Sequence, residues 1–364
     1  MGRRLGLMRL PWLMVLVVAT GCGEHSEPAP TPPKKLPAAN PQKSKFRFPT
    51  DNRALLRAAG EDDFFTPTGP GRSWRSGSFG CVRNTGTRIH EGIDIRALRR
   101  DENGEATDSV RASRDGKVAH INSNIAASNY GKYIVLKHEA DGLPVYTLYA
   151  HLNAVADGLE VGRSVKAGES VGILGRTSNT GDGISKERAH LHFEIGLQIH
   201  TQFESWFHHW YKGGKNHHGA WNGMNLLGLD AAEILRAEEA GGFDLASHLS
   251  EQPVLCRVRI HQAKIEWADR FPELVIQTAC AETLPAQAWE VDLNFNAIPI
   301  RLKPLYAEGL KAKAGGVRFE LLEVNDEVRR KHPCRSLIFK KGARWVLTTK
   351  GQRALDLLAW PGRE

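Results

Sequence analysis

The stretch HLHFEI, residues 190–195, decides how this sequence is interpreted. Polar and apolar side chains alternate strictly along it, as they do in a β-strand with one face in the core. The polar face carries His190, His192 and Glu194. Two imidazoles on one pleated face, backed by an apolar stripe, indicate a functional site.

A second segment, IHEGIDI at residues 89–95, places His90 and Asp94 four positions apart. It is not the helical HExxH motif of zinc proteases, because the second histidine is missing. Gly92 and the flanking isoleucines favour a strand. Positions i and i+4 share one face of a strand, so both side chains can point at one metal ion.

A third histidine, His151, ends the strand-like run YTLYAHL at residues 146–152. Taken alone, such a histidine is more often a hydrogen-bonded structural residue. The order HxxxD, then Tyr-x-His-Leu, then HLHFE, however, resembles the lysostaphin-type zinc endopeptidases, also called the LytM group. The resemblance covers about residues 75–197, and four further blocks support it: SGSFG (76–80), VRASRDGKV (110–118), YGKYIVLKH (130–138) and VKAGESVGILG (165–175).

The resemblance implies a mainly β catalytic domain, an antiparallel β-sheet with a groove, over residues 46–200. The resemblance also implies one Zn²⁺ per chain, bound by His90, Asp94 and His192. It implies that His151 and His190 are the catalytic histidines. Three protein ligands leave the fourth position of zinc for water, and two further imidazoles suit proton transfer near neutral pH. Glu194 lies on the same face of this strand, but we do not expect it to be catalytic. A carboxylate that orients a ligand histidine is an equally good interpretation of this residue.

Three stretches depart from the family pattern. ALRRDENGEATDS (residues 97–109) is longer than usual and indicates an inserted surface loop near the groove. SNTGDGISKERAH (178–190) is also lengthened, and we expect it to form one wall of the cleft. One extra residue separates Phe79-Gly80 from Arg83, so we do not carry a substrate-contacting role over to Arg83.

The N-terminus predicts export. Residues 1–21 begin with an Arg-rich stretch, and an apolar run that is too short to span a bilayer follows it. This order is typical of a signal peptide. The small residues before Cys22 resemble a bacterial lipobox, so we expect lipidation of Cys22; an ordinary cleaved signal with an incidental cysteine is the alternative. The Pro-rich residues 22–45 predict an extended tether. Together they predict a bacterial cell envelope protein, lipid-anchored to a membrane and facing the periplasm or the exterior.

Two regions follow the peptidase domain. Residues 201–250 form an aromatic- and histidine-rich connection and then a helical pattern, from residue 226 to about 248, broken at Gly241-Gly242. We expect the aromatic side chains of this connection to pack against the catalytic domain and its histidines to face water. A second metal site or a platform for stacking sugars is the less favoured alternative. Residues 251–364 predict a small α+β domain, β-rich and of unknown role, with strand-like runs that include ELVIQTA (273–279) and a terminal helix at about 352–359. This region is a candidate surface for an envelope protein partner.

Five cysteines suit an exported chain. With Cys22 lipidated, Cys81, Cys256, Cys280 and Cys334 allow three full pairings. We favour a Cys280–Cys334 bridge within the C-terminal domain, with Cys81 free and buried. A thiolate zinc site is disfavoured because no CxxC spacing exists.

The composition of the 364-residue chain, 41% apolar and 25% charged, is that of a folded protein and excludes global disorder. Its net charge is +8, and removal of residues 1–21 with their three arginines would leave 8 − 3 = +5, a modest excess that weakly favours an anionic partner. We predict a zinc-dependent endopeptidase that hydrolyses peptide bonds in peptidoglycan, in a cross-link or a stem peptide, with no nucleic-acid partner. The alternative is a non-hydrolytic LytM-type regulator that binds cell wall or activates another hydrolase; such members tend to lose ligands, whereas all five positions are filled here. A secreted protease acting on proteins is disfavoured by the lipobox and the tether.

Overall fold

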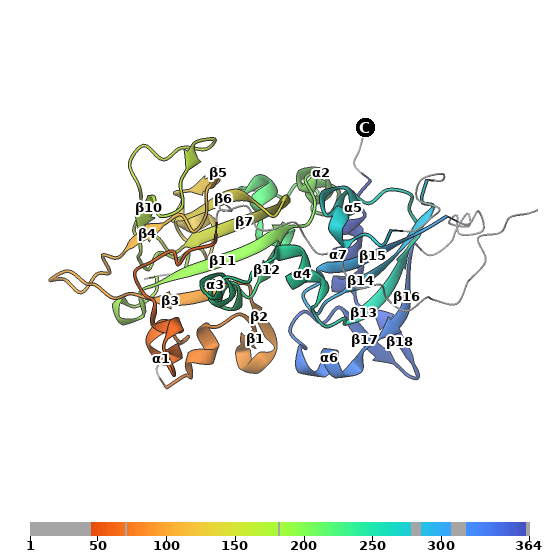
Figure 1. Ribbon diagram of the computed structural model, residues 1–364, viewed down its shortest axis with the longest axis horizontal. Coiled ribbons are helices and arrows are strands. Elements are labelled where there is room, and N and C mark those ends of the chain that lie inside the picture. The colour runs from red at the N-terminus through yellow and green to blue at the C-terminus, as the bar shows by residue number, and fades with distance from the viewer. Residues whose placement is uncertain (1–44, 70, 181–182, 278–284, 307–317, 362–364) are drawn as a thin grey trace, which may run out of the picture. The chain divides into compact units, whose positions relative to one another are not determined.

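A seven-stranded antiparallel sheet carries the motifs identified above (Figure 1). The computed structural model describes residues 45–69, 71–180, 183–277, 285–306 and 318–361, and Gln42–Glu364 form one compact unit. The signal peptide, Cys22, Cys280 and all but the last residue of the tether lie outside the described residues. Among the residues that are described, no helix is both long and apolar enough to cross a bilayer.

The strand order of the large sheet places the HLHFEI strand in its interior. Along the sheet the strands are β12 (Leu226–Leu229), β11 (His190–Gln198), β7 (Leu143–Ala150), β6 (Tyr133–Ala140), β5 (Gly116–Asn122) and β9 (Ser164–Val165), with β3 (Ile93–Arg96) also paired to β11. On one side β11 pairs with β7. On the other side it pairs first with β3, over its first four residues, and then with β12.

Smaller elements flank this sheet. They are the hairpin of β1 (Gly80–Arg83) and β2 (Arg88–His90), a sheet of β4 (Ser109–Arg111), β10 (Ser170–Ile173) and β8 (Ala154–Val155), and the helices α1 (Glu61–Phe64), α2 (Phe203–Trp210), α3 (Ala231–Ala240) and α4 (Leu245–Ser250). The segment 226–229, for which the sequence predicted helix, is the edge strand β12, because its backbone completes the pairing of β11. The predicted helix break is confirmed: Gly241 ends α3 at φ +81°, a conformation that favours glycine.

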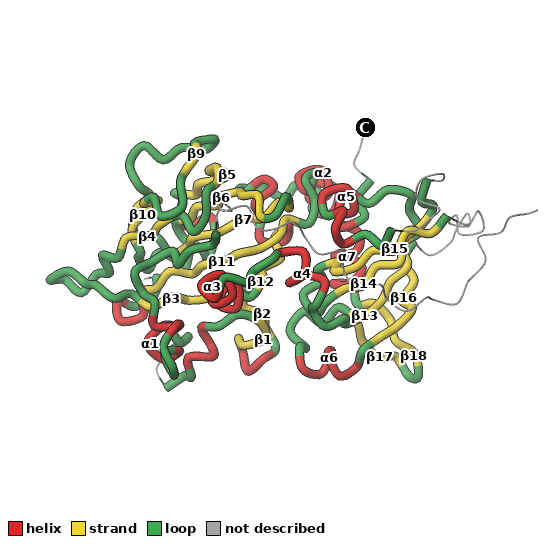
Figure 2. Tube along the Cα trace, in the orientation of Figure 1, coloured by secondary structure: helices red, strands yellow, loops and turns green. Residues whose placement is uncertain are grey.

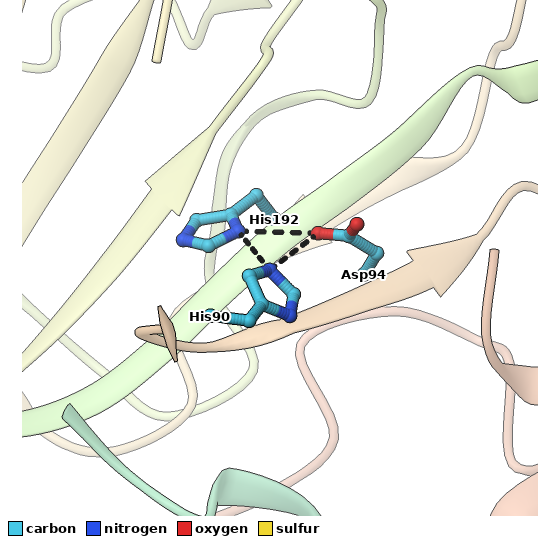
Figure 3. Close-up of side chains that lie close together, drawn as sticks. All are labelled: His90, Asp94 and His192. Atoms are coloured by element: carbon cyan, nitrogen blue, oxygen red, sulfur yellow. Dashed lines mark hydrogen bonds and ion pairs between the residues drawn. The ribbon is translucent and has the colours of Figure 1, made fainter. Parts of the chain in front are cut away.

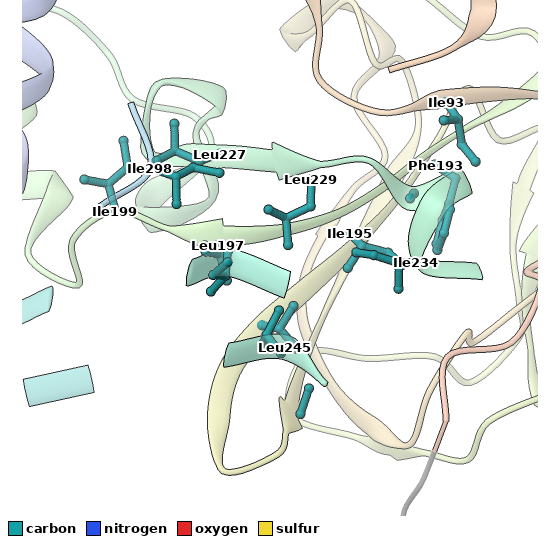
Figure 4. Packing of buried hydrophobic residues seen from close by; sticks show 14 of the residues in the cluster. Ile93, Phe193, Ile195, Leu197, Ile199, Leu227, Leu229, Ile234, Leu245 and Ile298 are labelled. Atoms are coloured by element: carbon teal, nitrogen blue, oxygen red, sulfur yellow. The ribbon is translucent and has the colours of Figure 1, made fainter. Parts of the chain in front are cut away.

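The apolar face of β11 packs into the core under α3 and α4. Phe193, Ile195 and Leu197 have no exposed surface. Figure 4 shows them in one cluster with Ile234 of α3 and Leu245 of α4. Burial of each such side chain stabilises the fold by about 1.5–3 kcal/mol. This apolar stripe fixes which face of β11 meets the core, and therefore turns the polar side chains of the motif to the opposite face.

The C-terminal region is an α+β arrangement, as expected (Figure 2). A four-stranded sheet has the order β15 (Pro299–Leu305), β14 (Ala288–Leu293), β13 (Cys256–Ile260) and β16 (Phe319–Val324); β17 (Ile338–Lys341) and β18 (Arg344–Leu347) form a hairpin, with α5 (Glu266–Arg270), α6 (Asp326–Lys331) and α7 (Thr349–Leu358) around them. The prediction of a strand at ELVIQTA is wrong over its described part. Residues 272–274 form a 3-10 turn that begins at a proline, and Val275 makes an isolated bridge.

The predicted Cys280–Cys334 bridge is wrong, and so is the prediction of a free Cys81. Cys334 is bonded to Cys81 of β1, 253 positions away along the chain. Cys256 of β13 is buried and free. The disulfide therefore fastens the C-terminal region to the β1–β2 hairpin, which ends at His90.

Candidate metal centre and cleft

Three side chains predicted to bind metal lie together at the junction of β2, β3 and β11 (Figure 3). The His90 Nε2 atom lies 3.0 Å from His192 Nδ1, and both nitrogens lie 3.1 Å from Asp94 Oδ1. All three residues are buried. His192 and Asp94 are cross-strand partners, so the pairing of β3 with β11 brings them together.

The predicted strand over residues 89–95 is in fact two short strands separated at Glu91 and Gly92. The break occurs where the backbone approaches β11 closely: a Cβ atom on Gly92 would lie 2.3 Å from Phe193 O and 2.8 Å from Glu194 Cγ. Only glycine fits there. This close approach lets His90 and Asp94 reach the same point although they lie on different strands.

Hydrogen bonds orient both imidazoles. His90 Nδ1 donates to the Ser78 carbonyl at 2.7 Å, which leaves Nε2 facing the centre. His192 Nε2 lies 2.9 Å from Glu194 Oε1, which leaves Nδ1 facing the centre. Glu194 is fully buried and accepts hydrogen bonds from two phenols, those of Tyr130 at 2.6 Å and Tyr146 at 2.7 Å. Carboxylates that fix a ligand histidine in this way are a regular feature of metal sites.

The donor set fits zinc. Two imidazole nitrogens and one carboxylate oxygen are ligands that zinc accepts at about 2.0–2.2 Å. Atoms that share a tetrahedral ion at such distances lie roughly 3.3–3.6 Å apart. The separations of 3.0–3.1 Å between the three facing atoms are close to this range.

The surroundings of Asp94 favour its carboxylate form despite its burial. Burial alone raises the pKa of this carboxyl, but the charges of His90, His190 and Arg83 outweigh that effect and hold the pKa well below its usual value. Arg83 Nη2 lies 2.5 Å from Asp94 Oδ2 and 2.8 Å from His90 Nε2. Burial opposes protonation of His192 too, yet its hydrogen bonds to Asp94 and another carboxylate raise its pKa to about 9.

The two predicted catalytic histidines lie beside this centre. His190, the first residue of β11, has Nε2 3.5 Å from Asp94 Oδ1 and donates from Nδ1 to the Arg188 carbonyl at 2.6 Å. His151 donates from Nδ1 to the Thr177 carbonyl at 2.8 Å, and its ring centroid lies 4.9 Å from that of His190. Burial, with the charges of the neighbouring histidines, holds the pKa of His151 well below its usual value.

The backbone of His151 is strained. Its φ of +61° is in the left-handed region, which non-glycine residues seldom adopt. Residues held in such conformations cluster at functional sites. The residue directly follows β7, so the backbone turns out of the strand at this position.

All five predicted side chains line one cleft of about 790 Å³. The segment predicted to form a wall does so through Asn179, Ile184 and Arg188. The inserted loop at residues 97–109 does not line the cleft; Arg100 instead hydrogen-bonds the carbonyls of Lys186 and Glu187 in that wall.

Several lining or supporting residues were not predicted from sequence. They are Arg83, Tyr130, Tyr146, His218 and Arg335. His218 corrects the expectation that the histidines of the connection face water, because it hydrogen-bonds the Tyr133 hydroxyl at 2.7 Å. Among the described residues, His90, Asp94 and His192 form the single cluster with metal-ligand spacing, so a second metal site in the connection is not found there.

Comparison with known proteins gives the region a family. Residues 88–202 match the sequence profile of Peptidase family M23, whereas no curated protein matches the chain. Three solved structures are similar. A zinc containing peptidase from Vibrio cholerae is 21% identical, with 42% of this chain and 36% of that chain covered and a TM-score of 0.26, and the antimicrobial peptidase lysostaphin from Staphylococcus simulans is 26% identical, with 33% of this chain and 40% of that chain covered and a TM-score of 0.25. The catalytic domain of a prophage-encoded M23 protein from Enterococcus faecalis is 24% identical, with 36% of this chain and 86% of that chain covered and a TM-score of 0.25. The sequence thus spans 36% and 40% of the first two chains. The segment 88–202, which holds the metal-centre candidates and both further histidines, is the part of the chain that matches Peptidase family M23.

Proposed function

We propose that this protein is a zinc-dependent endopeptidase that hydrolyses peptide bonds in bacterial peptidoglycan. One observation carries the proposal: His90, Asp94 and His192 converge to within 3.1 Å, with His151 and His190 beside them in one cleft. The M23 domain supports peptide-bond hydrolysis. The resemblance to lysostaphin-type enzymes supports peptidoglycan as the substrate and one zinc ion per chain.

Zinc held by three protein ligands activates water near neutral pH and polarises a carbonyl group. The chain supplies the proton transfers. His151 and His190 each donate Nδ1–H to a backbone carbonyl, so Nε2 of each neutral ring can accept the proton of an attacking water. The protonated ring is then a donor at Nε2, able to protonate the leaving amine or to hydrogen-bond the developing oxyanion. Burial and the charges of the neighbouring histidines lower the pKa of His151, which favours its neutral form with Nε2 free of a proton.

The test is digestion of purified peptidoglycan sacculi by the mature full-length protein, followed by chromatography and mass spectrometry of the fragments. The proposal predicts new peptide ends that identify the bond cut, and their loss when a chelator is present. Zinc-replete protein that leaves every peptide bond intact would instead favour a regulator that binds cell wall or activates another hydrolase.

We further propose that a lipid on Cys22 anchors the chain in the cell envelope. The support is the sequence: a short apolar run, small residues before Cys22, and a Pro-rich segment that would extend the folded body away from a membrane. The anchor would bring the cleft to a substrate that is itself fixed in the envelope.

A further inference from the structure

The C-terminal region contributes Arg335 to the cleft that contains the candidate metal ligands. This arginine lies far beyond the M23 match, which ends at residue 202. It directly follows Cys334, whose disulfide with Cys81 fastens its loop to the β1–β2 hairpin. The cleft of the peptidase domain is therefore completed by a residue from another part of the chain.

The guanidinium of Arg335 is held in place but not saturated. Its Nε donates to Oδ1 of the buried Asn296 at 2.6 Å, and the amide of Asn296 donates to the Gly228 carbonyl at 2.8 Å. Nη2 is buried, and it has no hydrogen-bond partner within the part of the chain that the structure describes. No acceptor of the described residues therefore neutralises this guanidinium by an ion pair, and its charge is available to a ligand in the cleft that Arg335 lines.

The cleft around Arg335 has an excess of positive charge. Arg83, Arg88 and Arg188 also line it, against the carboxylates of Glu91 and Asp94. Only Arg83 of these arginines forms an ion pair among the described residues, and its partner is the candidate metal ligand Asp94. An anionic group that enters the cleft is therefore attracted before it makes any contact.

We propose that Arg335 determines specificity by binding a carboxylate of the peptide substrate. The inference rests on the proposed function and narrows its substrate class to peptides that place a free carboxylate in this cleft. A carboxylate is a charged acceptor and forms a charge-assisted hydrogen bond with a guanidinium, whereas a carboxamide is neutral. Peptides whose carboxylates are amidated should therefore be poorer substrates.

The experiment compares one synthetic muropeptide, with its carboxylates free, against the same muropeptide with its carboxylates amidated. The ratio of the two kcat/KM values is measured for the wild type, Arg335→Gln, Arg335→Lys and Arg330→Gln. Arg330 is the matched control because it is exposed on α6, pairs with Asp326 and does not line the cleft. Dissociation constants for both peptides are measured by calorimetry in a His190→Ala background, which prevents turnover.

The wild type and Arg330→Gln should favour the free carboxylate by about tenfold or more. Arg335→Gln should bring the ratio near one, mainly through KM, and Arg335→Lys should lie between, because it keeps the charge but not the fork of donors. Equal use of both peptides by the wild type, or a preference that survives in Arg335→Gln, overturns the proposal. If no peptide is cleaved, the proposed function fails on its own. The dissociation constants then decide about Arg335, since a preference lost in Arg335→Gln supports it and equal affinities refute it.

Discussion

His190 and His192 are two positions apart on one face of β11 but have different contacts. His192 presents Nδ1 to His90 and Asp94, whereas His190 is 3.5 Å from the Asp94 carboxylate. His192→Ala should lose both zinc and activity. His190→Ala should keep zinc and lose activity by about 10²–10⁴-fold, the usual contribution of a general acid or base. Metal analysis with kinetics checks both, and equal zinc loss in the two variants would show that the roles are wrongly divided.

His138 makes stability depend on pH. It is buried on β6, its Nδ1 donates to the Asp115 carbonyl, and burial lowers its pKa to about 4 from 6.5. The unfolded chain takes up the proton near pH 6.5 and the folded chain only near pH 4, so stability is highest above pH 6.5 and falls between these values. The loss from pH 7 to pH 5 should be about 2 kcal/mol from this residue.

Urea unfolding at the two pH values measures this loss. His138→Gln should flatten the pH profile, whereas His217→Gln, at an exposed position, should leave it unchanged. Identical pH profiles for the wild type and His138→Gln would contradict the assignment.

The five side chains that line the cleft together were predictable as a group, because each belongs to a short local motif, while their roles stay predictions. It did not identify Arg83 as a neighbour of Asp94, since that contact depends on how the β1–β2 hairpin lies against β3. The sequence did not predict the position of Arg335 either, because no motif near it indicates contact with a cleft whose other lining residues precede it by more than a hundred positions.

The turn between β2 and β3 sets the geometry of the centre. Gly92→Ala would place a methyl group against the backbone of Phe193, and the displaced turn would move His90 and Asp94. We expect zinc affinity to fall by about 10–100-fold, as for other changes that misorient ligands. Gly242→Ala is the control, because a Cβ there meets nothing within 4 Å and the glycine has no positive φ. Competitive chelator titration measures the affinities, and a Gly92→Ala protein with wild-type affinity would show that the close approach is unimportant.

Elements with strict alternation were predictable, whereas those defined by their neighbours were not. β11 was evident from HLHFEI. β12 lies within residues 226–248, whose helical spacing predicts helix, and it is a strand because it completes the edge beside β11. β15 was missed: its two prolines weaken the strand pattern, and the strand pairs only with β14 among the named strands.

At the scale of the whole molecule, the Cys81–Cys334 disulfide joins the β1–β2 hairpin to the C-terminal region. Its reduction should lower the free energy of unfolding by about 2–5 kcal/mol, because the unfolded chain regains the freedom of a long loop. Urea unfolding with and without reductant measures this. A Cys81→Ala, Cys334→Ala protein should not respond to the reductant, and a wild type equally stable in both conditions, with its thiols shown to be free, would contradict the prediction. Burial raises the pKa of Cys256 to about 12, so its thiol stays protonated and unreactive.

Mass spectrometry of the mature chain identifies its first residue and any modification on it. The lipid-anchor proposal predicts a first residue Cys22 that carries a mass consistent with acyl chains. An unmodified N-terminus at any other residue would end that proposal and leave the M23 domain unaffected.

The disulfide pairing could not be derived from the sequence, because four cysteines allow three full pairings and their spacing does not select one of them. The pairing follows from which surfaces meet in the folded chain, and the strand patterns of the two regions say nothing about that contact.

Titration of zinc into metal-free protein, with cleavage of one defined cross-linked muropeptide as the readout, tests the central claim most directly. The account predicts that activity rises to a plateau at about one zinc per chain, and that His192→Ala stays inactive at the same zinc concentration. A wild-type protein that binds one zinc and leaves the peptide uncut, or one that cuts it equally well without metal, would contradict it.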